Sequence, residues 1–256
     1  MQRFLPADPL KPFVRAYLLI ESATGTENRV VPDTSIVLAF RYKGAITQHT
    51  HEGQPRDLPF SAITGLRKSS RLIRYASDTA TLLVLFREGG AAAFFREPLH
   101  ELFGLSLSLD ELIGRRALAE TEERLAEAQN HAQRIALVER FLVARLRSAK
   151  PEHRVNQAVS ILKTAHGHIG IKSLAQSLWF SQDAFEKQFR RAVGASPKQF
   201  ASILRFRHLI ESHAADRSLT DLAYEAGYFD QAHFIKDFRS FTGQTPKAFF
   251  KTGRFW

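Results

Sequence analysis

Short apolar runs alternate with turn-forming clusters over the first third of the chain. The runs are rich in β-branched and aromatic residues, which favours strands over helices, and they cover residues 13–20, 36–42, 72–75 and 82–86. Between them lie clusters of glycine, proline and polar residues that form turns, at residues 32–34, 43–44, 52–55 and 87–90. We expect a small β-sandwich or β-barrel in this part of the chain.

Helical spacing replaces this pattern after the last of these strands. Residues 97–103 and 108–113 predict two short helices, and Ser108 with Glu111 has the spacing of a capping box. A longer helix is expected at 118–128. The next helix carries an apolar stripe at spacings of three and four, made of Ile135, Val138, Leu142 and Leu146. The stripe either packs on its own β domain or forms a dimer interface.

A polar segment with a proline, residues 148–153, separates two helical patterns and is the best candidate for a linker. We therefore expect one domain over residues 1–147 and a second over residues 154–256. A chain of 256 residues has the length of one large domain or two ordinary ones, so its length permits this division.

The second domain contains an internal repeat at an offset of 49 residues. Nine of the 20 positions from Ser181 to Phe200 are identical in the two copies, whereas about one identity is expected by chance. The identical residues include phenylalanines, a glycine and a proline at matching places. The repeat therefore predicts a duplicated structural unit.

Each copy has the pattern of a helix-turn-helix. In the first, residues 171–178 predict a short helix, Trp179-Phe180 forms the turn, and Ser181 caps a second helix. Phe185 and Phe189 face inward at a spacing of four. Gly194 ends that helix, and Ser196-Pro197 begins the next. The first unit covers about residues 171–192.

The second copy covers about residues 219–241. Leu219, Leu222 and Ala223 belong to its short helix, and its turn, residues 227–229, is one residue longer. We expect Asp230 to cap the following helix, which carries Phe234 and Phe238. Gly243 then ends this helix and Thr245-Pro246 begins the next one, as Gly194 and Ser196-Pro197 do in the first copy.

The outward face of each second helix has side chains suited to the major groove. Gln pairs with adenine, Lys and Arg pair with guanine or phosphate, Glu pairs with cytosine, and Ala or Ile contacts a thymine methyl. A solvated helix face or a phosphate contact is the alternative for each residue. The candidates are Gln182, Asp183, Glu186, Lys187 and Arg190 in the first copy, and Gln231, Ala232, His233, Ile235, Lys236 and Arg239 in the second.

Charge supports a nucleic-acid partner. The formal net charge is +10, which favours nucleic acid or an anionic membrane surface. Residues 1–150 carry 21 basic and 17 acidic side chains, and residues 151–256 carry 15 and 9, so the excess is denser in the second domain. The chain has no cysteine, which fits a reducing cytoplasm. Its first residues lack a signal or transmembrane pattern, so we expect a soluble cytoplasmic protein without a membrane partner.

A catalytic or metal function has little support in the sequence. His49 and His51 alternate as on one face of a strand and are a metal candidate, but a solvated loop or strand edge is the favoured reading. His166 and His168 predict a turn. No nucleophile elbow, phosphate-binding loop or paired-carboxylate motif stands out. We expect no enzyme activity, no cofactor and no metal site.

The repeat region, about residues 155–250, resembles the DNA-binding domain of the AraC/XylS family of bacterial transcription regulators. The resemblance is carried by Ala223, Gly227-Tyr228, Asp230-Gln231, Phe234, Phe238-Arg239, Gly243 and Thr245-Pro246 at their spacings. It implies a seven-helix domain in which a long helix, about residues 197–214, joins two helix-turn-helix units. The sequence departs from the family in having Phe249 at a position that is usually tyrosine.

The N-terminal half resembles an uncharacterised β-rich domain found fused to AraC-type modules, through residues 31–33, 86–95 and 109–114. The resemblance implies a sensor or dimerisation domain, a homodimer formed through its helices, and RNA polymerase as a partner. A small-molecule effector is expected, although no motif identifies it. A regulator that acts through protein partners without an effector is the alternative. The expected fold class is α+β: a β-sandwich or barrel-like domain ending in helices, then an all-α domain.

Overall fold

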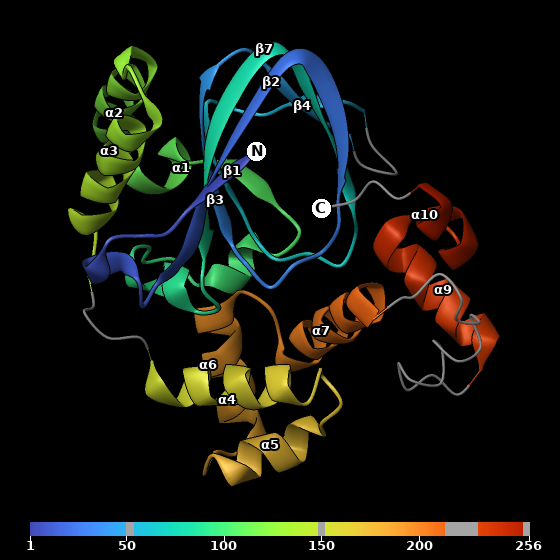
Figure 1. Cartoon of the computed structure of the whole chain (residues 1–256). Coiled ribbons are helices and arrows are strands. Elements are labelled where there is room, and N and C mark those ends of the chain that lie inside the picture. Colours follow the sequence, from blue (N-terminus) through green and yellow to red (C-terminus); the bar gives the residue numbers. More distant parts are fainter. Residues whose placement is uncertain (50–53, 148–151, 213–229, 253–256) are drawn as a thin grey trace.

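A computed structural model describes residues 1–49, 54–147, 152–212 and 230–252, except for the side chains of His233 and Thr252. Strands dominate the first hundred residues and helices the rest, so the chain is α+β (Figure 1). The described strands are β1 (Gln2–Phe4), β2 (Val14–Val30), β3 (Val37–Lys43), β4 (Ile46–His49), β5 (Arg56–Asp57), β6 (Ser61–Thr64), β7 (Arg71–Phe86) and β8 (Ser106–Ser108).

The eight strands belong to one antiparallel sheet with the order β1-β2-β7-β3-β6-β8, and β4 pairs with β7 and β5. The sheet curls, which fits a barrel-like domain rather than two facing sheets. Strands β2 and β7 pair along their length, with Val14 opposite Phe86 and Val30 opposite Arg71. This pair bends over the domain as an arch (Figure 1). Both of its ends lie on the side of the C-terminal helices.

The strands of the arch are longer than the apolar pattern predicted. That pattern indicated a strand ending near residue 20 and two separate strands at 72–75 and 82–86, whereas β2 continues to Val30 and β7 is one strand from Arg71 to Phe86. Residues 21–30 of β2 are mostly polar and none of them except Ser22 is buried, and residues 76–78 of β7 are exposed, so these stretches lack the apolar alternation on which strand prediction rests. Gly25 and Asp78 have positive φ angles of 85° and 56° in this polar stretch. Cross-strand pairing maintains both strands through these irregular positions.

Helices cover one side of the sheet, at the left in Figure 1. The 3₁₀ helices η1 (Asp8–Leu10), η2 (Gly90–Ala93) and η3 (Leu99–Leu102) are short, and η3 lies where residues 97–103 predicted a helix. The α-helices are α1 (Asp110–Ile113), α2 (Arg115–Glu127) and α3 (His131–Val143). Glu111 Oε1 accepts from the Ser108 backbone N–H at 3.1 Å, which is one half of the predicted capping box.

The apolar stripe of α3 packs on its own domain. Val138 and Leu142 have no exposed surface and belong to the main core. Ile135 and Leu146 pack against that core, although Leu146 lies beyond the end of α3. Because these residues face the sheet domain, the stripe itself is not a dimer interface.

The C-terminal helices lie beneath and beside the sheet in Figure 1. They are α4 (His153–Thr164), α5 (Ile171–Ser177), α6 (Gln182–Val193), α7 (Pro197–Ser212), α9 (Gln231–Thr242) and α10 (Pro246–Thr252). The core is continuous from the sheet into these helices, because Phe86 and Phe94 belong to the same buried cluster as Phe189 and Phe200. Most of the expected linker, residues 148–151, and the expected short helix of the second copy, within 213–229, lie outside the described residues.

Candidate nucleic-acid interface

The first helix-turn-helix consists of α5 and α6, and its local structure follows the expected pattern. Ser181 is the N-cap of α6, and its Oγ accepts from the Ala184 N–H at 3.3 Å. Gly194 ends the helix with a φ of 94°, a left-handed conformation that glycine adopts readily. Phe185 and Phe189 are buried. Their side chains fix α6 on the core and leave its opposite face at the surface.

The exposed face of α6 carries the first set of groove candidates. Gln182, Asp183, Lys187 and Arg190 are exposed, and Glu186 is half-buried. Gln182 Nε2 donates to Glu186 Oε1 at 3.2 Å, so these side chains form a local pair on the helix surface. Asp183 lies in the first turn of α6, where a negative charge is stabilised by the helix dipole.

The second unit contributes α9, whose buried and exposed faces match those of α6. Phe234 and Phe238 are buried, as expected. Thr245 Oγ1 accepts from the Ala248 N–H at 3.3 Å and caps α10, so a helix begins at Thr245-Pro246 as predicted. The exposed candidates are Gln231, Ala232, Lys236 and Arg239, whereas Ile235 is half-buried and packs against the core. His233 belongs to α9, but its side chain is not described, and residues 219–229 lie outside the described ranges.

Helix α7 connects the two units and packs on both. At its start, Ser196 and Gln199 form a reciprocal cap: the Gln199 N–H donates to Ser196 Oγ at 3.2 Å and the Ser196 N–H donates to Gln199 Oε1 at 2.9 Å. Phe200 lies 5.5 Å from Phe189 of the first unit, measured between ring centroids. Phe206 stacks on Phe241 of the second unit at 4.4 Å. The connecting helix is therefore part of both cores.

The β domain contacts the C-terminal end of α9 through backbone carbonyls. The Ser70 N–H donates to the Phe241 carbonyl oxygen at 2.6 Å, and Ser70 Oγ donates to the Thr242 carbonyl oxygen at 3.0 Å. Arg29 donates to the same Thr242 oxygen at 3.3 Å. These carbonyls end α9 and lack partners within the helix. No sequence pattern predicts these contacts, because every residue has a backbone acceptor.

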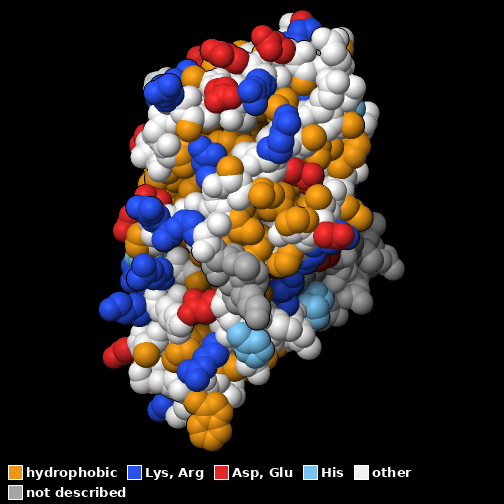
Figure 2. Space-filling view, turned by 90° about the vertical axis from the view of Figure 1, so that its left-hand side faces the viewer, with side chains coloured by type: hydrophobic (Ala, Val, Ile, Leu, Met, Phe, Trp, Pro, Cys, Tyr) orange, Lys and Arg blue, Asp and Glu red, His pale blue; other side chains and the backbone are white. Residues whose placement is uncertain are grey.

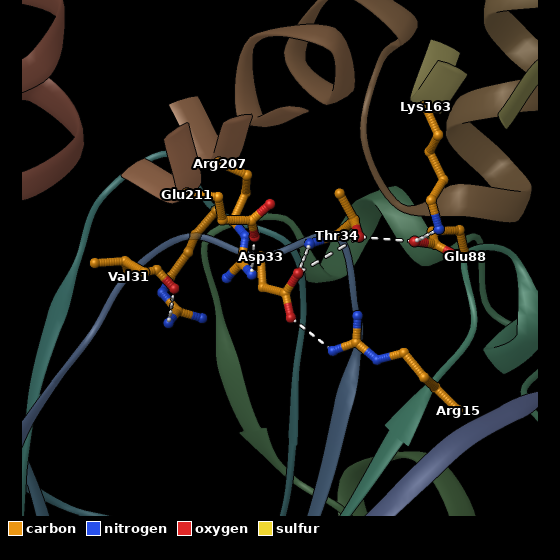
Figure 3. Close-up of polar contacts among 9 residues, drawn as sticks. Arg15, Val31, Asp33, Thr34, Glu88, Lys163, Arg207 and Glu211 are labelled. Carbon is orange, nitrogen blue, oxygen red and sulfur yellow. Dashed lines mark hydrogen bonds and ion pairs between the residues drawn. The ribbon is translucent and has the colours of Figure 1, made fainter. Parts of the chain in front are cut away.

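A polar network joins the other end of the arch to α4 (Figure 3). Lys163 on α4 donates to Glu88 Oε1 at 2.9 Å, and Thr34 Oγ1 donates to the same oxygen at 2.8 Å. Burial alone would raise the pKa of Glu88, but the hydrogen bond from Lys163 and further hydrogen bonds outweigh it and hold the pKa below 4.5. Glu88 is therefore a carboxylate that contacts both the β domain and α4.

Asp33 is a second carboxylate in this network and is half-buried. Its Oδ2 accepts from Arg15 at 2.7 Å, and Arg207 of α7 lies beside it (Figure 3). Burial alone would raise the pKa of Asp33, but Arg15 and then Arg207 outweigh it and lower the pKa below 3.8. Charge attraction thus acts between the β domain and the connecting helix.

The histidine candidates are described only in part. His49 lies at the end of β4 and is half-buried, and His51 lies outside the described residues. Among the described residues, no three His, Cys, Asp or Glu side chains are grouped as metal ligands. His166 and His168 lie in the turn after α4, as expected, and His166 stacks on His208 of α7 at 3.8 Å. Within the described ranges, no helix is long and apolar enough to cross a membrane.

Two family models match the chain. The model described as a helix-turn-helix domain covers residues 174–252. The model described as a domain of unknown function, DUF6597, covers residues 2–108. The two matches cover the C-terminal helical units and the β-sheet, respectively.

A curated relative matches across both regions. The HTH-type transcriptional activator RhaS of Citrobacter koseri is 24% identical over 216 residues, which cover 73% of this chain and 74% of the relative. Solved structures of similar organisation include ToxT from Vibrio cholerae, with 9% identity, a TM-score of 0.47, and coverage of 91% of this chain and 96% of ToxT. A probable AraC family regulator from Rhodopseudomonas palustris has 25% identity and a TM-score of 0.36, and covers 40% of this chain and 99% of its own.

The duplicated unit, its exposed recognition faces and these matches define a DNA-binding transcription regulator of the helix-turn-helix class. The chain carries a helix-turn-helix domain over residues 174–252, where the sequence resembles the AraC type, and a DUF6597 domain over residues 2–108.

Proposed function

We propose that the chain binds promoter DNA sequence-specifically by placing α6 and α9 in successive major grooves. One observation carries the proposal: each of the two helices buries two phenylalanines at matching positions, and the exposed faces of the two helices differ in their side chains. They therefore have one packing scheme and two chemical surfaces. The residues proposed to contact DNA are Gln182, Asp183, Glu186, Lys187, Arg190, Gln231, Ala232, His233, Ile235, Lys236 and Arg239.

Genome-wide mapping of bound DNA, followed by footprinting of the enriched sites, tests this proposal. We expect protected segments one helical turn apart on one face of the duplex, because the two units would occupy neighbouring major grooves. Uniform coverage without enriched sites would contradict sequence-specific binding. The genes beside the enriched sites also indicate the chemical class of the effector.

We propose that residues 1–147 form a sensing domain and residues 154–256 a DNA-binding domain, with residues 148–153 as the linker. In support, the β domain contacts α4 through Glu88 and the end of α9 through Ser70. A ligand that changes the β domain could therefore change the helical region at both places. We propose a small-molecule effector and an activating role in the bacterial cytoplasm through RNA polymerase, since the curated relative is named an activator. The proposed activity is binding without catalysis.

Thermal shift against a metabolite library tests the sensing role, because a ligand that binds the native state raises the melting temperature. A compound that stabilises the chain and changes its affinity for the enriched DNA would support an effector. Constant DNA affinity in the presence of every stabilising compound would favour the effector-independent alternative.

We also propose that two copies of the chain associate through the outward face of α3. Its apolar stripe faces the sheet, so the opposite face remains, where Leu137 and Val143 border a shallow hollow of about 770 Å³ beside Ala7 and Pro9. Hydrophobic side chains gather on this side of the molecule (Figure 2). Charges of both signs line the hollow, so a two-fold copy could pair opposite charges across the interface. They are Arg124, Glu127, Glu139 and Arg140.

The oligomeric state of the Val143→Glu variant tests this interface. Val143 is 48% exposed, so the substitution should leave the fold intact and convert dimers to monomers in analytical ultracentrifugation. Leu105→Glu is the matched control, since Leu105 is 46% exposed outside this hollow. A wild-type chain that is monomeric at all concentrations would contradict the proposed dimer.

A further inference from the structure

Trp179 occupies the turn between α5 and α6 in an uncommon conformation. Its φ is 59°, in the left-handed region that bulky residues rarely adopt. The turn is well defined, because the Trp179 N–H donates to the Gln176 carbonyl oxygen and the Phe180 N–H donates to the Ala175 carbonyl oxygen, both at 3.0 Å. The orientation of the backbone at Trp179 is therefore set by the hydrogen bonds of the turn.

Glycine is the residue that this backbone conformation favours. The second copy has it: four residues after Ala223 comes Gly227, whereas four residues after Ala175 comes Trp179. The first copy therefore carries a bulky residue in a strained conformation at the position where the sequence of its duplicate has glycine. Strain of this kind gathers at functional sites.

The indole ring contributes nothing visible to the core. Trp179 is 91% exposed, the highest value among the exposed large hydrophobic side chains of the described residues. An exposed side chain that also strains its backbone does not stabilise the fold. Its contribution must come from contact with another molecule.

The surroundings of Trp179 favour DNA over an apolar protein surface. It lies three residues before the first residue of α6, at the end of a recognition helix that contacts base edges. The neighbouring exposed side chains are polar, and Arg154 lies beside the turn with its guanidinium 5.2 Å from the Phe180 ring. Hydroxyl, amide and guanidinium groups of this kind contact phosphate and sugar. The polar neighbours are Gln176, Ser177, Ser181 and Gln182.

We propose that Trp179 contacts the sugar-phosphate backbone at the edge of the major groove that α6 enters, with its ring packed on a deoxyribose and its Nε1–H donating to a phosphate oxygen. An indole suits this place because it combines an apolar face with one donor. The contact is independent of base sequence. The inference rests on the proposed role of α6 as a recognition helix.

The Trp179→Gly variant separates a DNA contact from a structural role. Glycine fits the left-handed turn, so the melting temperature should not fall. Affinity for DNA should fall about three- to tenfold, the range that one neutral hydrogen bond corresponds to. The loss should be equal for preferred and unrelated sequences. The salt dependence of binding should stay the same, because no cation is removed. Trp179→Phe, which keeps a ring and removes the donor, should show a smaller loss.

Fluorescence of Trp179 gives a direct readout without changing the residue. The chain has two tryptophans, so Trp256→Phe leaves Trp179 as the only indole. The probe is a duplex of about 30 base pairs, long enough for two neighbouring major grooves, selected from a random library by the wild-type chain. Acrylamide should quench Trp179 strongly in the free protein and several-fold less in the complex.

The outcomes separate this inference from the proposed function. Unchanged acrylamide quenching in a tight complex, or unchanged DNA affinity of Trp179→Gly, overturns the contact and leaves DNA binding by α6 and α9 intact. A lower melting temperature of Trp179→Gly assigns the residue to the fold and likewise overturns the inference. Failure of the wild-type chain to select any duplex overturns the proposed function and this inference with it.

Discussion

Lys163 Nζ lies 2.9 Å from Glu88 Oε1, and this ion pair joins α4, the helix that precedes the first helix-turn-helix unit, to the β domain. The Glu88 side chain is 9% exposed and the Lys163 side chain 48% exposed. The pair is therefore half in solvent, and its contribution lies above that of a surface pair and below that of a fully buried one.

A double-mutant cycle with Glu88→Gln and Lys163→Met should give a coupling energy of about 1 kcal/mol in urea unfolding. The exposed Lys163 limits the value, because water screens its charge. The pair of Lys43 and Asp78 is the control, since its side chains are 58% and 73% exposed. Equal coupling in the two pairs would show that the contact between the domains has no special role in stability.

Acid should weaken the contact between the β domain and the helical units. The folded-state pKa values of Glu88 and Asp33 are lowered from 4.5 and 3.8. A carboxyl with a lowered folded pKa contributes stability above its unfolded pKa, and that contribution is lost as the pH falls through the folded pKa. Unfolding free energies measured from pH 7 down should therefore decline below about pH 4.5. The decline should be shallower in Glu88→Gln, and an identical decline would contradict the assignment to Glu88.

Lys236→Ala should lower the affinity for selected DNA by about 1 to 3 kcal/mol if Lys236 reads a guanine, with a changed preference at one base pair. A loss that is uniform over all sequences would assign Lys236 to a phosphate. The side chain is exposed on α9, so the fold should tolerate the change. Lys43→Ala is the charge-matched control on the β domain. Unchanged affinity of Lys236→Ala would remove this residue from the interface.

Gly194→Ala should destabilise the chain by about 1 kcal/mol or more, because alanine is strained at a φ of 94°. An added methyl group would also lie 3.2 Å from the Leu99 carbonyl oxygen and 3.3 Å from Ile36 Cδ1, both in the β domain. Urea unfolding measures the effect. Gly104→Ala is the control: Gly104 has a φ of 80°, but no atom lies within 4 Å of the added methyl position. An equal loss in the two variants would assign the whole effect to backbone strain.

The sequence predicted the helical units well because their signals are local. The caps at Ser181 and Ser196, the end at Gly194 and the buried phenylalanines of α6 follow from residue type and spacing. Whether the outward residues contact DNA stays a prediction. The left-handed conformation of Trp179 was not foreseen, since residue type favours glycine there.

The remaining features depend on contacts between distant residues. The polar halves of β2 and β7 are strands because they pair with each other, and no periodic apolar pattern marks them. The hydrogen bonds from Ser70 to the end of α9 use carbonyl oxygens that every residue has. The sequence left two partners open for the stripe of α3, its own β domain or a second copy, and the folded chain shows that it packs in the core beside the sheet.

The arch of β2 and β7 has one end beside Glu88, which contacts α4, and the other at Arg29 and Ser70, which contact the end of α9. One pair of strands therefore contacts helices that precede and follow α7 in the chain. Neighbouring major grooves on one face of DNA repeat about every 34 Å. If α6 and α9 occupy such grooves, a flatter or tighter arch would favour a different pitch of the duplex, and strand geometry far from the DNA would select operators by their twist rather than by their base sequence.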